Sequence, residues 1–258
     1  MRQTLALSRL YLVGALRKQA HLAALLVAFA LLFLPSYVNA FSLGLHGFER
    51  VAKDFGLTLM SLFSVAMAVL LGSTTVRADL TSRALYPLLA RPLSRGAYLS
   101  AHYLALLVLL AASLLLQAAA LCAGLAWLTK GFDASVLLAT YGIFLQAAVL
   151  GAVCLAFSIR CSPPLAGTIG VAAFLIGNLS GAFIRFFLVE DRDSVVSAAL
   201  ARGLKAIVPN LALLDLKDPA VHHLTIPVGY LPAISYYTGI WVVLLLLLAQ
   251  LTFRRLDL

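Results

Sequence analysis

Four arginines lie within one short stretch of an otherwise weakly charged chain. Residues 76–96 read VRADLTSRALYPLLARPLSRG and contain Arg77, Arg83, Arg91 and Arg95, together with a single acid, Asp79. The planar guanidinium group presents parallel N–H donors, which can pair with a carboxylate through two hydrogen bonds at once. The stretch is therefore suited to docking on an acidic protein surface. The alternative is that its arginines only keep this part of the chain on the positive side of a membrane.

Other residue types that could carry chemistry show no matching pattern. His222 and His223 are adjacent, so in a helix or strand they point to different sides and form a poor chelate by themselves. Cys122, Cys154 and Cys161 have no paired spacing and are expected to act as small apolar side chains. The chain also lacks the GxxxxGK[ST] loop that cradles phosphates. We therefore expect no catalytic residues, no metal site and no ATP site in this chain.

The composition is that of a protein that crosses a membrane several times. Of 258 residues, 63% are hydrophobic and only 11% are charged, whereas soluble domains are typically about 25% charged. About 20 apolar residues are needed to cross the hydrocarbon layer as a helix. Uncharged runs of that length predict an all-α polytopic protein with six transmembrane helices, at residues 21–39, 55–75, 97–127, 135–159, 165–189 and 232–253.

The arginine-bearing stretch must lie at a membrane face, because it joins the second expected span to the third. Leu80, Leu85, Leu88 and Leu89 recur at helical spacing between its polar residues, which predicts a short amphipathic helix along the membrane. Two prolines, Pro87 and Pro92, then break the helix, because proline lacks an amide donor and clashes with the preceding turn. Residues 76–96 are thus expected to form a helix, a bend and a re-entry into the membrane.

The distribution of charge predicts the orientation of the chain. If the N-terminus is cytoplasmic, the segments on that side hold eleven of the 19 basic residues and two of the ten acids. The other side then holds eight bases and eight acids, so the whole net charge of +9 lies on the cytoplasmic side. This is the asymmetry expected of a membrane protein with both termini in the cytoplasm. The basic composition therefore gives no reason to expect nucleic-acid binding.

Two further segments are expected outside the spans. Residues 1–20 place leucines among arginines and predict an interfacial helix on the cytoplasmic face, a frayed leader to the first span being the alternative. Residues 190–218 form the largest segment on the other side, and after Ser194 their apolar residues recur at helical spacing. That pattern predicts an amphipathic helix on the outer leaflet; a docking surface for a periplasmic accessory protein is the alternative.

The middle of each expected span contains no Asp, Glu, Lys or Arg. Gln117, Gln146 and Asn178 are the polar residues expected near the middle of the membrane. Ion-coupled transporters use ionisable groups or broken helices there, so we expect the energy for any transport to come from outside the membrane. Gly177 and Gly181 form a GxxxG pair, which permits close helix packing. The packing could be within the chain or at a subunit interface.

A family resemblance is carried by residues 88–95, which read LLARPLSR and are followed by Tyr98 and Leu99. The stretch resembles the LLSRPVSR…YL signature of ABC-2-type exporter permeases, in particular the branch that includes the permease of nitrous-oxide reductase maturation. Asp79 stands at the position of an acid in that family. The sequence departs from the family where Arg83 and Ala84 replace a Gly-Thr pair, and where His102 replaces a lysine.

The resemblance implies a role as the permease subunit of an ATP-driven exporter in the bacterial cytoplasmic (inner) membrane. Two copies of a separate ABC ATP-binding subunit would bind ATP and Mg²⁺, and a second permease copy or a similar permease would complete the complex. Residues 76–96 would form the coupling helix, with the ATPase contacting Arg77, Asp79, Arg83, Arg91, Pro92 and Arg95. The resemblance does not indicate a substrate. The competing hypothesis is a structural or scaffold membrane protein without a transport cycle.

Overall fold

The computed structural model describes residues 20–41, 48–81, 95–129, 131, 133–190 and 209–254, and within them it contains helices and no strands. The elements in chain order are α2 (Ala20–Phe41), α3 (Phe48–Thr81), α5 (Arg95–Thr129), α6 (Ser135–Ser158), α7 (Pro163–Glu190), the 3₁₀ helix η1 (Leu211–Leu214), α9 (Lys217–Val221) and α10 (Tyr230–Arg254). The expected interfacial helix at residues 1–20 and the amphipathic helix after Ser194 fall almost wholly outside the described residues.

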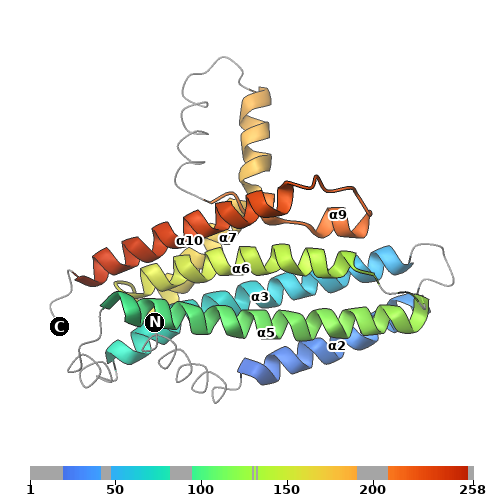
Figure 1. Cartoon of the computed structure of the whole chain (residues 1–258), viewed down its shortest axis with the longest axis horizontal. Helices are drawn as coiled ribbons and strands as arrows, with labels where there is room; N and C mark the ends of the chain where they lie inside the picture. The colour runs from blue at the N-terminus through green and yellow to red at the C-terminus, as the bar shows by residue number, and fades with distance from the viewer. Residues whose placement is uncertain are drawn as a thin grey trace.

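Five of the described helices are long and apolar enough to cross a membrane. The candidate spans are Leu22–Ala40, Glu49–Arg77, Gly96–Thr129, Ser135–Ser158 and Tyr230–Phe253. Figure 1 shows that the helices containing them, α2, α3, α5, α6 and α10, run roughly parallel in one bundle. Their large apolar side chains are exposed along much of α2 and α10, as expected for helices whose outer faces contact lipid. The sequence prediction of a helical multi-pass membrane protein is confirmed.

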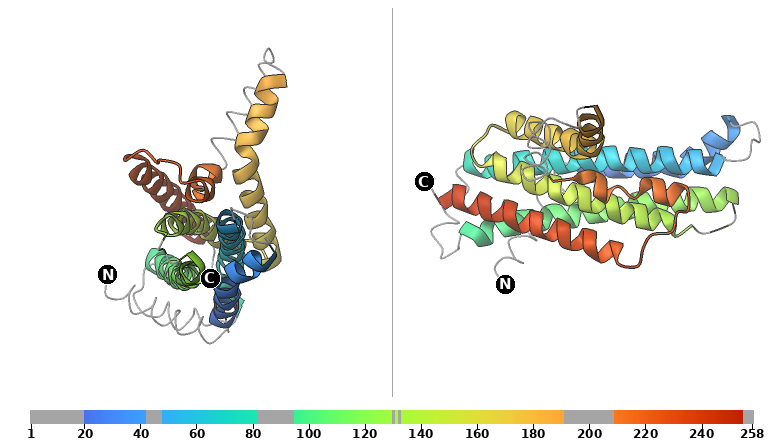
Figure 2. Two further views of the ribbon diagram at one scale, coloured as in Figure 1. Left: turned by 90° about the vertical axis from the view of Figure 1, so that its right-hand side faces the viewer. Right: turned by 90° about the horizontal axis from the view of Figure 1, so that it is seen from above.

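The sixth expected span, at residues 165–189, corresponds to α7. In the part of α7 whose side chains the structure describes, Pro163–Leu179 is apolar but shorter than a span. Figures 1 and 2 show that α7 starts beside the bundle and that its C-terminal half projects away from the other helices. A bundle of six spans therefore remains a prediction.

The core of the bundle is organised around α6. This helix packs against α3, α5, α7 and α10, and most of its residues are buried. Small residues allow this close packing: a Cβ atom added to Gly72 of α3 would lie only 2.7 Å from the Cβ of Cys154 and 3.0 Å from the carbonyl oxygen of Gly151. Because backbones can approach this closely only without intervening side chains, these positions fix where α3 crosses α6.

The helix boundaries of α3 differ from those expected for the second span. The helix begins at Phe48, seven residues before the expected start at 55, and ends at Thr81, six residues beyond the expected end at 75. No proline or glycine follows Gly72 in this stretch, so nothing interrupts the helix as it leaves the apolar region. Arg77 and Asp79 therefore lie on the last turns of α3, and not on a separate helix.

Candidate functional site

The two ends of the bundle each carry a cluster of polar side chains. Figure 1 places the start of α3, the end of α5 and α9 at one end of the bundle. The end of α3 and the starts of α5 and α7 lie toward the opposite end, with the end of α10. We call these the Lys53 end and the Asp79 end.

At the Asp79 end, one carboxylate joins α3 to α5. The Tyr98 hydroxyl donates a hydrogen bond to Asp79 Oδ2 over 3.0 Å, and His102 Nε2 lies 3.1 Å from the same oxygen. Tyr98 and His102 are four residues apart, so they share one face of α5. An ionised Asp79 can accept a hydrogen bond from each of these two side chains. We call Asp79, Tyr98 and His102 the Asp79 cluster.

The cluster is held in place by burial and by a third helix. Tyr98 is 2% exposed and His102 is 3% exposed. The rings of Tyr98 and Phe253, which lies on α10, are stacked with centroids 5.9 Å apart and an interplanar angle of 11°. One turn away, a Cβ atom on Gly96 would lie 2.9 Å from the side-chain nitrogen of Gln250 on α10. The end of α3, the start of α5 and the end of α10 therefore form one packed unit.

Members of the Asp79 cluster lie within the arginine-bearing stretch and just after it. Asp79 lies three residues before residues 82–94, and Tyr98 lies four residues after them. Arg83, Arg91 and Pro92 fall within residues 82–94, which are outside the described residues, and Arg95 is the first residue of α5. Arg77 is partly exposed on α3. The structure thus brings Asp79 together with Tyr98 and His102.

Sequence reasoning noted Tyr98 and His102 but did not assign them to the site. Both belong to the region that carries the family resemblance, in which His102 stands in place of a lysine. The sequence signal that could have indicated the cluster is His102, which stands four residues after Tyr98 at a position where the family resemblance predicts a lysine. A lysine at position 102 would also be a cation or hydrogen-bond donor facing Asp79. The sequence alone does not show that Asp79 and His102 are in contact, because 23 residues separate them.

Gly177 lies against a segment that is not a transmembrane helix. A Cβ atom at Gly177 would lie 2.8 Å from Leu211 Cγ and 2.9 Å from the carbonyl oxygen of Pro209. On α6, a Cβ atom at Gly142 would clash with the carbonyl oxygen of Leu214. The two glycines therefore provide the space in which η1 and its preceding residues pack. Gly181 also lies on α7.

Polar side chains form hydrogen bonds with the non-helical backbone around η1. Gln146 Nε2 donates a hydrogen bond to the carbonyl oxygen of Leu211 over 2.9 Å. The Tyr230 hydroxyl donates to the carbonyl oxygen of Leu213 over 2.7 Å, and the backbone N–H of Asn210 donates to the Tyr237 hydroxyl over 2.8 Å. Gln146 lies near the middle of α6, so η1 reaches deep into the bundle. Non-helical backbone at this depth is stable only when its polar groups are paired within the protein.

A buried lysine organises the opposite end of the bundle. Lys53 lies on α3 and is only 1% exposed, although the second span was expected to begin only at residue 55. Its ammonium group forms ion pairs with Glu49, over 2.7 Å, and with Asp133, which precedes α6. It also lies 3.4 Å from His223 Nε2. We call Glu49, Lys53, Asp133 and His223 the Lys53 cluster.

The ionisation of Asp133 reflects these contacts. Burial raises the pKa of its carboxyl group, but hydrogen bonds from Lys53 and Ser135 favour the charged form more strongly and lower the pKa to about 2. The backbone N–H of Ser135 is one of these donors, at 2.9 Å from Asp133 Oδ1. Asp133 is therefore a carboxylate at any physiological pH, and it neutralises the buried ammonium group.

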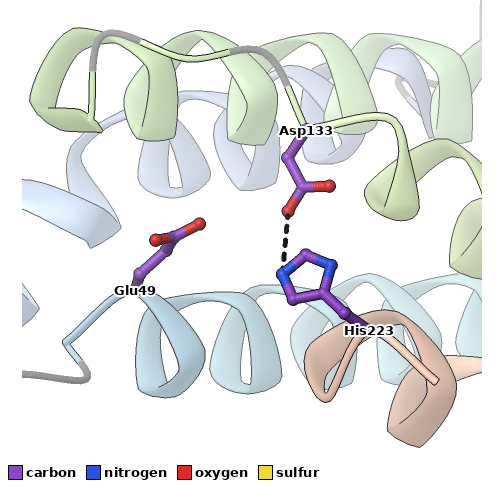
Figure 3. A group of neighbouring side chains, drawn as sticks. All are labelled: Glu49, Asp133 and His223. Atoms are coloured by element: carbon purple, nitrogen blue, oxygen red, sulfur yellow. Dashed lines mark ion pairs between the residues drawn. The ribbon is translucent and has the colours of Figure 1, made fainter.

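The same end contains three groups that could ligate a metal. Potential ligand atoms of Glu49, Asp133 and His223 lie within 4.8 Å of one another, and Figure 3 shows the three side chains converging from separate elements. However, the ammonium group of Lys53 contacts all three. A metal ion would have to displace a cation that the chain supplies itself. His223 thus lies beside the ion pairs of Lys53, with its Nε2 atom within hydrogen-bonding distance of the ammonium group.

Comparison with models of known protein families gave no match, and comparison with curated proteins gave none either. The resemblance to exporter permeases therefore rests on the residues of this chain.

Proposed function

We propose that the chain is the membrane-spanning permease subunit of an ATP-driven ABC exporter, and that a separate ATPase subunit docks on residues 76–96. The observation that carries the proposal is the position of the Asp79 cluster. It joins α3 to α5 immediately beside the arginine-bearing stretch, through the hydrogen bonds from Tyr98 and His102 to Asp79. A partner that moves this stretch would pull on both helices together.

Helices of this length would carry such a movement across the membrane. α3 has 34 residues and α5 has 35, so at 1.5 Å per residue each extends about 50 Å. Both pack against α6, and α3 reaches from the Asp79 cluster to Lys53. A displacement at the Asp79 end would therefore reach the opposite end through continuous helices.

The proposal includes the rest of the complex. The ATPase, present in two copies, would bind ATP and Mg²⁺, because this chain has no phosphate-binding loop. A second permease copy, or a similar permease, would complete a pathway in the bacterial inner membrane, with both termini and residues 76–96 in the cytoplasm. The charge asymmetry of the chain supports this orientation.

The direct test is to express the chain together with each ABC ATP-binding subunit of the same genome and to analyse the purified material by native mass spectrometry in lipid. The proposal predicts a complex of two permease chains and two ATPases that hydrolyses ATP. Recovery of the chain alone, with the ATPase present and folded, would contradict the proposal and favour the scaffold hypothesis.

A further inference from the structure

The short helix α9 packs against α3 and α6 through a small apolar surface. It has only five residues, and an isolated helix of that length is unstable in water. Two of its residues, Ala220 and Val221, are buried in a cluster with apolar side chains of α3 and α6. Beyond it the chain becomes exposed, with Leu224 58% and Val228 99% exposed. The position of α9 therefore depends on its small apolar contact and on whatever holds His223.

His223 has a left-handed backbone conformation at the C-terminal cap of α9, where the backbone N–H of Leu224 donates a hydrogen bond to the carbonyl oxygen of Pro219 over 3.0 Å. Its φ is 51°, and within the described residues it is the only residue other than glycine with a positive φ. This left-handed conformation is unfavourable for a residue with a side chain. The ring of His223 meets the Lys53 ammonium group at 3.4 Å and lies 4.0 Å from Asp133. These contacts connect the turn after α9 to α3 and to the residues preceding α6.

The Lys53 ammonium group cannot easily lose any one of its partners. Taking a charge out of water is costly, and a buried ion pair is stable only when its partners remain in place. Here the partners come from three separate parts of the chain: Glu49 on α3 itself, Asp133 before α6, and His223 after α9. Of these contacts, the one with His223 is the one that depends on the docked position of α9.

We infer that the Lys53 cluster controls local opening at this end of the bundle by holding α9 in its docked position. When His223 leaves the cluster, α9 loses its main polar attachment, and water reaches Ala220 and Val221 while the helices of the bundle stay folded. Local opening of a weakly attached segment is a general property of proteins. This inference goes beyond the proposed function, because it requires neither an ATPase nor a substrate.

The test measures the accessibility of one buried position. A single cysteine is introduced as Ala220→Cys in a chain in which Cys122, Cys154 and Cys161 are replaced by alanine, and its reaction with a water-soluble maleimide is followed in lipid nanodiscs. Lys53→Met should raise the labelling rate by about tenfold or more, because removal of one partner of a buried ion pair is strongly destabilising. A control cysteine, Ala147→Cys in α6, should stay protected.

Lys217 provides a matched control at the same end of the bundle. It is also part of α9, but its ion pair with Asp215 spans 3.5 Å and is partly exposed. Lys217→Met should therefore change the labelling of Ala220→Cys less than about twofold. Protection of Ala220→Cys in folded Lys53→Met protein would overturn the inference. So would equal labelling of both cysteine positions, because that would show opening of the whole bundle.

If Lys53→Met does not fold, variants of the more exposed His223 decide the question. His223→Ala removes the ring, whereas His223→Gly removes the ring and also relieves the unfavourable φ. The inference predicts faster labelling of Ala220→Cys in both, because both lose the contact with Lys53. Unchanged labelling in either variant would overturn it, since the ring contact would then not be what holds α9.

Discussion

Both ends of α3 contact neighbouring parts of the chain through a charged side chain, but the two arrangements differ. At the Asp79 end, one carboxylate accepts from a tyrosine and a histidine of a single neighbouring helix. At the Lys53 end, one buried ammonium group is shared by two carboxylates and a histidine from three parts of the chain. The first arrangement joins the end of α3 to the start of α5. The second connects α3 to the residues before α6 and to the turn after the short helix α9.

The largest difference between the ends should appear when the central charge is removed. Lys53→Met leaves Glu49 and Asp133 without their cation and should lower the stability of this end of the molecule by about 3–5 kcal/mol. Asp79→Asn keeps an acceptor for Tyr98 and should cost less, about 1–3 kcal/mol. Thermal unfolding of both variants in the same detergent measures the difference. Equal losses would show that the two ends do not differ as described.

A second prediction concerns the irregular segment between the two ends. Gly142→Ala adds a Cβ atom that would clash with the carbonyl oxygen of Leu214, so it should destabilise the protein by about 1–3 kcal/mol. Gly239 on α10 has no atoms within 4 Å of an added Cβ, and Gly239→Ala is the control. This control should be neutral or slightly stabilising, because alanine favours the helix. If both variants behave alike, η1 does not pack tightly against α6.

The contact between His102 and Asp79 can be tested by placing lysine, the residue type expected from the family resemblance, at position 102. His102→Lys should preserve the tie between α3 and α5 to within about 1 kcal/mol, because lysine can also donate to Asp79. His102→Leu leaves the carboxylate with one donor fewer and should cost more, about 1–2 kcal/mol. Unfolding midpoints of the two variants provide the measurement. A lysine variant less stable than the leucine variant would contradict the pairing.

The smallest effect is the pH dependence contributed by Asp133. Its pKa is about 2 in the folded protein and about 3.9 in an unfolded chain. The folded value is the lower one, so the stabilisation is fully present above about pH 4 and is lost as the pH falls toward 2. Wild-type protein should therefore lose more stability than Asp133→Asn between pH 5 and pH 3, and neither should lose any through Asp133 between pH 8 and pH 5. Parallel acid unfolding curves would contradict this.

The sequence predicts the bundle better than it predicts the two clusters. Long uncharged runs identify spans because the hydrocarbon layer excludes charge along a whole helix. Lys53, in contrast, stands among Glu49, Arg50 and Asp54, which is a pattern typical of a surface loop. Its partners Asp133 and His223 are 80 and 170 residues away in the chain. Only packing of α3 against the start of α6 and against α9 brings these charges together.

The C-terminal end of α3 could not be predicted from the sequence pattern either. The end of an apolar run marks where a span leaves the membrane, but a helix ends only where a breaker or competing contact stops it. After Gly72 no breaker occurs before Thr81, and Asp79 is held by Tyr98 and His102 of the next helix. The extension of α3 therefore depends on a contact between α3 and α5 that periodicity does not reveal.

We propose that residues 76–96 couple this chain to an ATPase. The most direct measurement is the binding of the ATPase subunit to the double variant Arg91→Lys/Arg95→Lys, with Arg91→Ala/Arg95→Ala alongside it. Lysine keeps the positive charge that orients the chain but lacks the planar fork that pairs with a carboxylate. Both variants should insert normally and bind the ATPase at least about tenfold more weakly, because losing a buried charged partner at an interface costs about 2–5 kcal/mol. Normal binding and ATP-driven transport by the lysine variant would show that these arginines only orient the chain.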